Sequence, residues 1–162
     1  TIGIEPVIID VLDHLKLKQG YIADCVALLM PTSPFRVVKD INKALQIFFK
    51  KNLTSVVSVS RAIANQNPHW MLKRTENDKV ILFTGENLSK IKSRRQDLPD
   101  VYIRNDFVYI FNPDNLYQEP IGLYGDEVEL MVVEDERIDI DINTEIEWLI
   151  AETIFKQNHI IE

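Results

Sequence analysis

The chain has 162 residues, of which 46% are hydrophobic and 27% are charged, and its formal net charge is −7. This length allows one substantial core, the acidic balance argues against a nucleic-acid polymer as the main partner, and no apolar run is long enough to span a membrane. Its one cysteine excludes a disulfide framework and indicates a cytoplasmic protein.

The first half of the chain has the pattern of an α/β protein. Apolar residues spaced three and four apart predict a helix over Ile4 to Lys18. An unbroken apolar run, Cys25 to Met30, then predicts a strand buried on both faces of a parallel sheet. A second amphipathic helix is predicted from about Lys39 to Lys51, and a β-branched strand over Thr54 to Val59. Strand, helix and strand together predict a right-handed βαβ unit.

A stiff polar loop, Pro31 to Pro34, ends the first predicted strand. The loop therefore lies at the carboxyl end of the predicted sheet, where open α/β folds bind their ligands. Without further motifs, a rigid turn explains it equally well.

The second half is less regular. Two short apolar stretches, Trp70 to Leu72 and Val80 to Phe83, predict a small hairpin. A bent strand or strand pair is predicted over Val101 to Phe111, and another strand over Glu127 to Val133. The last predicted helix, Thr144 to Asn158, begins with a Thr-x-x-Glu capping box.

Two groups of charged residues are candidates for a site. Four cations gather in an otherwise acidic chain, which indicates either an anion site or a solvated face: Lys90, Lys92, Arg94 and Arg95. Asp139 and Asp141 are two residues apart on a segment of alternating pattern, so their carboxylates are expected on one side. Such a pair could share a Mg²⁺ ion. Alternatively, the segment is a half-exposed edge strand whose acidic side chains face water.

Three motifs in order resemble the signatures of the acylneuraminate cytidylyltransferases. The first is Pro31 to Arg36, read as PTSPFR. The second is Arg94 to Pro99 followed by Asn105 and Tyr109, and the third is Arg137 to Asp141, read as RIDID. Together they are far more specific than any one of them, and the chain is identified as resembling this family.

The resemblance implies a fold and an activity. The fold would be α/β, with a mostly parallel sheet flanked by helices, of the Rossmann-like nucleotide-diphospho-sugar transferase type, with a small β excursion in the middle. Residues 1–162 would form a single domain, in which about 60–112 serve dimerisation and sugar binding. The enzyme would use Mg²⁺ to transfer CMP from CTP to the anomeric hydroxyl of a nonulosonic, sialic-acid-like sugar, release pyrophosphate and act as a homodimer.

The resemblance also assigns site residues. Asp139 and Asp141 would hold the metal, and Arg95 and Gln96 would face the carboxylate of the sugar acid. The remaining assignments line the nucleotide and sugar pocket: Thr32, Ser33, Arg36, Asn105 and Tyr109.

Three departures from the family accompany these assignments. Met30 replaces a usual Gln and Asp106 replaces a usual Gly. The glycine- and lysine-bearing phosphate loop is not found, and the chain starts at Thr1 without a methionine. We therefore expect an N-terminally truncated chain that is inactive by itself.

Two other functions stay open. A metal-dependent glycosyltransferase also uses an Asp-x-Asp motif on an α/β sheet. A non-catalytic dimerising fragment would use the apolar residues of the predicted hairpin: Trp70, Met71, Leu72 and Phe83. The sequence does not select which nonulosonic acid is the acceptor.

Overall fold

The computed structural model describes residues 3–134 and 140–159. The chain divides into two compact units. The first consists of Thr1–Val59 with Arg104–Glu162, and the second of Ser60–Ile103. No helix of the described residues is long and apolar enough to cross a membrane.

The predicted helices are confirmed in the first unit: α1 is Ile4–Gln19, α2 is Val38–Lys51 and α3 is Glu145–His159. The capping box of α3 is also confirmed. The backbone N–H of Thr144 donates to Glu147 Oε2 at 2.8 Å, and that of Glu147 donates to Thr144 Oγ1 at 3.3 Å. These reciprocal bonds satisfy donors that the helix start would otherwise leave unpaired.

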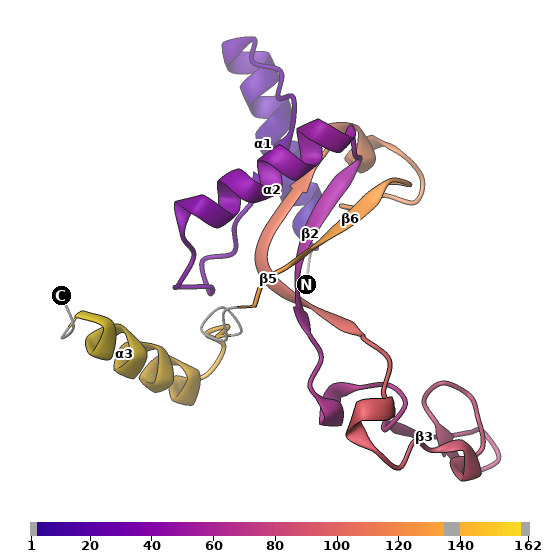
Figure 1. Ribbon diagram of the computed structural model, residues 1–162. Helices are drawn as coiled ribbons and strands as arrows, with labels where there is room; N and C mark the ends of the chain where they lie inside the picture. The colour runs from indigo at the N-terminus through magenta and orange to yellow at the C-terminus, as the bar shows by residue number, and fades with distance from the viewer. Residues whose placement is uncertain (1–2, 135–139, 160–162) are drawn as a thin grey trace. The chain divides into compact units, whose positions relative to one another are not determined.

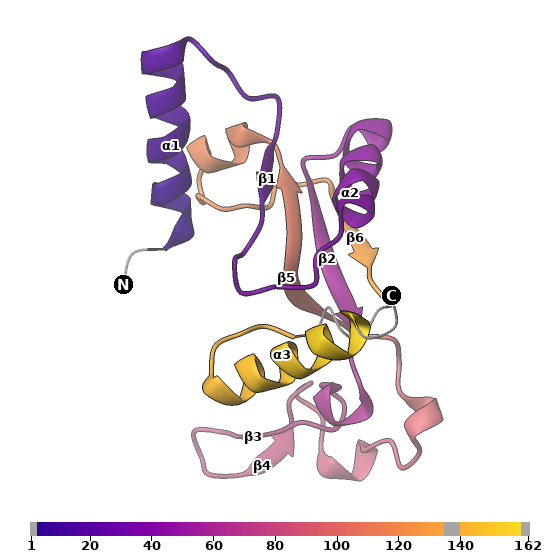
Figure 2. The same ribbon diagram turned by 90° about the vertical axis from the view of Figure 1, so that its left-hand side faces the viewer.

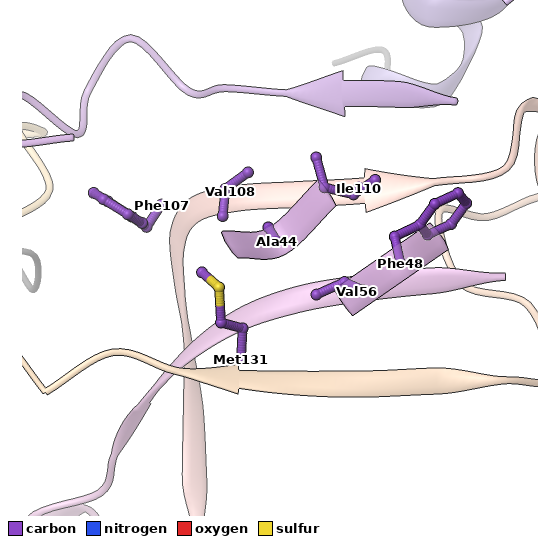
Figure 3. Close-up of a cluster of buried hydrophobic side chains, with 7 residues drawn as sticks. All are labelled: Ala44, Phe48, Val56, Phe107, Val108, Ile110 and Met131. Atoms are coloured by element: carbon purple, nitrogen blue, oxygen red, sulfur yellow. The ribbon is translucent and has the colours of Figure 1, made fainter. Parts of the chain in front are cut away.

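The first unit contains a four-stranded sheet, whose strands lie in the order β1-β5-β2-β6. Its strands are β1 (Val26–Leu28), β5 (Tyr102–Phe111), β2 (Ser55–Arg61) and β6 (Val128–Val132). β1 is antiparallel to β5, whereas β2 is parallel to β6. In Figure 3 the arrow of β5 points against those of β1 and β6. The sheet is therefore mixed.

The α/β class and the helix-flanked sheet are confirmed, but the expectation for Cys25 to Met30 is wrong. Only Val26–Leu28 form a strand, which is at the edge of the described sheet. Ala27 is exposed and Leu29 is 38% exposed, so the run is not covered on both faces. The reason is that β5, a strand from much later in the chain, lies between β1 and β2. The sheet is correspondingly less parallel than expected.

Two apolar clusters hold the sheet between α1 and α2, which cover its opposite faces (Figures 1 and 2). The α2 face buries Ala44, Phe48, Val56, Phe107, Val108, Ile110 and Met131 (Figure 3). The α1 face buries Ile8, Val57, Val59, Tyr109, Phe111, Leu116 and Leu123. β5 contributes to both clusters because alternate side chains of a strand point to opposite faces. It is the central strand of the core.

The second unit contains the predicted hairpin, formed by antiparallel strands β3 (Leu72–Arg74) and β4 (Val80–Leu82). Its turn includes Asp78 in the left-handed conformation, with φ of 59°. Short 3₁₀ helices complete this unit, at Ala64–Gln66, Leu88–Lys90 and Arg95–Asp97. Another, Pro113–Tyr117, follows β5 in the first unit.

Truncating a buried residue of β5 should destabilise the first unit strongly. Ile110 is fully buried, so Ile110→Ala should lower the free energy of unfolding by about 2–5 kcal/mol. Urea unfolding followed by circular dichroism measures the loss. Leu130→Ala is the control, because Leu130 is 44% exposed on β6 and should cost about 1 kcal/mol or less. Equal losses in both variants would contradict the assigned core.

Candidate functional site

Three segments that are distant in the sequence meet in the first unit. The carbonyl of Thr32 accepts a hydrogen bond from the N–H of Ile142 at 2.9 Å. The hydroxyl of Ser33, a buried residue, donates to the carbonyl of Asp106 at 3.2 Å. The Pro31–Pro34 loop is thereby tied both to β5 and to the segment that carries Asp141. We refer to the residues gathered here as the loop site: Thr32, Ser33, Arg36, Asn105, Asp106, Tyr109 and Asp141.

Arg36 fastens the loop to β5. Its Nε donates to the carbonyl of Phe107 at 2.6 Å, and its Nη2 donates to the carbonyl of Met30 at 2.7 Å. The guanidinium also lies 5.5 Å from the centroid of the Phe107 ring, within the range of a cation–π contact. Burial lowers the pKa of Arg36. Two nitrogens of Arg36 therefore stabilise the fold by binding main-chain carbonyls. Its contact with a substrate stays a prediction.

Asn105 is held by a residue that the sequence analysis did not single out. Its Oδ1 accepts from the hydroxyl of Ser58 at 2.6 Å and from the N–H of Phe107 at 3.3 Å. Ser58 is fully buried on β2, and its hydroxyl in turn accepts from the N–H of Val108 at 2.8 Å. In the sequence Ser58 is one position of a β-branched run, and nothing there marks it.

A polar cluster surrounds the bend of β5. Asp106 has φ of 52°, and its Oδ1 accepts a hydrogen bond from the hydroxyl of Tyr109. Burial, followed by the bond to Asp106 and its charge, raises the pKa of Tyr109. Arg104 Nη1 donates to the hydroxyl of Tyr124 at 3.0 Å, and this bond is the main cause of a raised pKa of Arg104. Arg104 and Tyr124 were missed because only the fold makes them neighbours.

The two carboxylate oxygens of Asp141, which the motif suggests as a metal ligand, differ in their hydrogen bonding. Its Oδ2 accepts from Asn143 Nδ2 at 2.6 Å, while its Oδ1 is buried without a hydrogen-bond partner among the described residues. A buried carboxylate oxygen left unpaired is costly unless a cation compensates it. Asp139 lies outside the described residues, which contain no cluster of three His, Cys, Asp or Glu side chains able to hold a metal.

Arg95 and Gln96 belong to the second unit, where both are exposed. Arg95 lines a hollow of about 170 Å³ together with Arg61 and Asp100. Arg61 Nη1 donates to Asp100 Oδ1 at 2.5 Å, so that guanidinium already has an anionic partner. The contact of Arg95 with the carboxylate of the sugar acid stays a prediction.

No protein-family model matches the chain. Post-translational flagellin modification protein B of Campylobacter coli is 26% identical over 129 residues, which are 80% of this chain and 52% of that protein. CMP-N,N'-diacetyllegionaminic acid synthase of Legionella pneumophila is 29% identical over 135 residues, which are 83% of this chain and 55% of that protein. The chain thus spans about half the length of the curated relatives it matches. These similarities confirm the resemblance to CMP-sialic acid synthetase-like proteins that the three motifs indicated.

Among solved structures, a 4-diphosphocytidyl-2C-methyl-D-erythritol synthase from Anaerococcus prevotii matches with a TM-score of 0.58 and 14% identity. The match covers 96% of this chain and 68% of that one. At this identity the likeness concerns the fold, and it confirms a nucleotide-diphospho-sugar transferase fold.

The hydrogen bond from Tyr109 to Asp106 makes a prediction about alkaline pH. Because the folded-state pKa of Tyr109 is raised, its contribution to stability is complete below the unfolded pKa of about 10 and is lost as pH rises further. Tyr109→Phe should lower the free energy of unfolding at pH 7 by about 1–3 kcal/mol. It should also flatten the fall in stability above about pH 10.

Urea unfolding at a series of pH values between neutral and strongly alkaline tests this. Tyr21→Phe is the control, because Tyr21 is 55% exposed. Parallel pH profiles for the wild type and Tyr109→Phe would show that Tyr109 does not carry the effect.

Proposed function

We propose that the chain supplies the acceptor- and metal-binding part of a cytidylyltransferase. The reaction is transfer of CMP from CTP to the anomeric hydroxyl of a nonulosonic, sialic-acid-like acid, with release of pyrophosphate. The observation that carries the proposal is the meeting of the motif segments in the loop site, through the bonds of Ser33 to Asp106 and of Ile142 to Thr32. Similarity to a CMP-N,N'-diacetyllegionaminic acid synthase supports the substrate class.

The chemistry sets the tasks of the residues. The hydroxyl of the acid attacks the α-phosphorus in line, and the bond to pyrophosphate breaks. Asn105 and Tyr109 orient the acid, so that their contribution is positioning of the nucleophile. Thr32 and Ser33 border the nucleotide and the sugar. Bound to Asp139 and Asp141, Mg²⁺ would offset the charge of the phosphate oxygens.

The second unit contributes two further features of the proposal. Arg95 would grip the carboxylate of the acid through a charge-assisted pair of hydrogen bonds. The hairpin would pair two copies into a homodimer, because the apolar side chains of Leu72 and Phe83 are each 55% exposed. The single cysteine is consistent with a cytoplasmic location. Light scattering that gives the mass of one chain in solution would exclude this dimer.

Binding of CTP by the 162 residues themselves should be weak. Triphosphates are bound by backbone N–H groups and a lysine in a glycine-rich loop between a strand and a helix. None of the glycines of the chain stands in such a position: Gly3, Gly20, Gly85, Gly122 and Gly125. Calorimetric titration with CTP and Mg²⁺ measures this, and tight stoichiometric binding would refute our placement of the nucleotide.

The activity itself is tested on the intact protein that contains this chain. We expect pyrophosphate release that requires CTP, Mg²⁺ and a nonulosonic acid together. Hydrolysis of a nucleotide-sugar donor without any need for CTP would favour a glycosyltransferase instead.

Asp141→Asn should weaken Mg²⁺ binding by at least about tenfold, because a neutral amide is a poorer ligand for a hard cation. Calorimetric titration of Mg²⁺ into the chain measures the affinity, and Asp126→Asn, on an exposed loop, is the control. Without Mg²⁺, Asp141→Asn should also unfold at an equal or higher urea concentration, because it removes the charge from a carboxylate whose Oδ1 is buried without a described partner. Unchanged Mg²⁺ affinity would remove Asp141 from the metal site.

Arg95→Ala should weaken binding of the acid by the equivalent of about 1.5–3 kcal/mol while leaving CTP binding unchanged. Titration with N-acetylneuraminic acid measures it. Arg74→Ala is the control, since the Arg74 side chain is 67% exposed and pairs with Asp78 in the hairpin. An effect confined to CTP would assign Arg95 to the nucleotide.

A further inference from the structure

Asp106 has an unusual backbone conformation for its place in the fold. Three described non-glycine residues have a positive φ: Asn52 at 51°, Asp78 at 59° and Asp106 at 52°. Asn52 ends helix α2 and Asp78 lies in the hairpin turn, where the chain must reverse. Asp106 instead lies inside the ten-residue strand β5. A left-handed residue costs about 1–3 kcal/mol, so neighbouring groups must hold it there.

One hydroxyl holds the backbone of Asp106 and another holds its side chain. The hydroxyl of Ser33 donates to the main-chain carbonyl of Asp106 at 3.2 Å, and the hydroxyl of Tyr109 donates to its Oδ1. Tyr109 is only 4% exposed, so its ring cannot follow a moving carboxylate. Both the backbone and the carboxylate of Asp106 are therefore held in one orientation.

The second carboxylate oxygen of Asp106, Oδ2, is available to accept a hydrogen bond from a ligand. No described residue donates a hydrogen bond to Asp106 Oδ2, and the residue is half-buried at the loop site. The Asp106 carboxylate interacts electrostatically with Arg104 and Tyr109, and Arg104 in turn donates to the hydroxyl of Tyr124. A fixed carboxylate oxygen with unused lone pairs attracts N–H and O–H donors and repels another carboxylate.

We propose that Asp106 is an acceptor-binding residue: its Oδ2 takes a hydrogen bond from an N–H or O–H group of the nonulosonic acid, and its charge keeps the acid's own carboxylate away. This inference rests on the proposed function and specifies how the acid lies in the loop site. An acylamino group, of the kind named in the diacetyllegionaminic acid relative, supplies such an N–H.

The chain offers a matched pair of variants. Asp106→Gly removes the carboxylate and relieves the backbone strain, whereas Asp78→Gly does the same in the hairpin turn of the second unit, which contains no residue of the loop site. Asp106→Asn tolerates the left-handed conformation and keeps an acceptor for the Tyr109 hydroxyl, but places an NH2 donor where Oδ2 was. Each is titrated calorimetrically with N-acetylneuraminic acid and with N,N'-diacetyllegionaminic acid, and its thermal midpoint is recorded.

Asp106→Gly should bind the acids about ten- to a hundredfold more weakly, as expected for the loss of a hydrogen bond to a charged group. Asp106→Asn should be weakened to a similar extent, because its NH2 group cannot accept that hydrogen bond. Asp78→Gly should bind like the wild type. The acid affinity separates this role from a structural one. The thermal midpoint does not, because Asp106→Gly relieves strain but also removes the acceptor of the buried Tyr109 hydroxyl.

Equal acid binding by the wild type, Asp106→Gly and Asp78→Gly would overturn the inference. The two proposals can also be separated. If acid binding depends on Asp106 but the intact protein shows no CTP-dependent transfer, the inference is supported and the proposed function is overturned. Failure of the wild type to bind either acid would overturn both.

Discussion

The grip of Arg36 on two main-chain carbonyls is the interaction on which the rest of the loop site depends. One side chain joins Met30, at the start of the proline loop, to Phe107, just past the bend of β5. Charge-assisted hydrogen bonds are stronger than neutral ones, and the partial burial of Arg36 reduces competition from water. Without this link the proline loop would have no fixed place against the strand.

β5 connects the core to the site, because one half of the strand is buried and the other half carries polar groups. Residues 107–111 are buried among the apolar clusters, whereas residues 104–106 lie at the bend with their side chains half-buried or exposed. The hydroxyl of Ser58 connects these two halves by bonding both Asn105 and the N–H of Val108. The side-chain oxygen of Asn105 is therefore held by a residue of the buried core.

Two carboxylates of the loop site have an oxygen without a protein partner, and the two differ in environment. Asp141 Oδ1 is buried, which favours a cation, whereas Asp106 is half-buried and held by Tyr109. A metal can compensate the first at close range, while the second suits a hydrogen-bond donor. Under the proposed function, Asp141 would bind the metal and Asp106 would bind the acid, although both are aspartates.

Local pattern determined the helices, the hairpin and the three motifs of this chain, because helical spacing and turn chemistry are short-range properties. Only the tertiary structure decided that β5 lies between β1 and β2, because strand pairing between distant segments leaves no local trace. The same holds for Ser58, Arg104 and Tyr124, whose roles come from neighbours 47, 20 and 20 positions away in the chain. Arg36 is a similar case. The motif indicated that it binds a ligand, but in the fold it binds two main-chain carbonyls, and the sequence does not show which carbonyls are left unpaired for it.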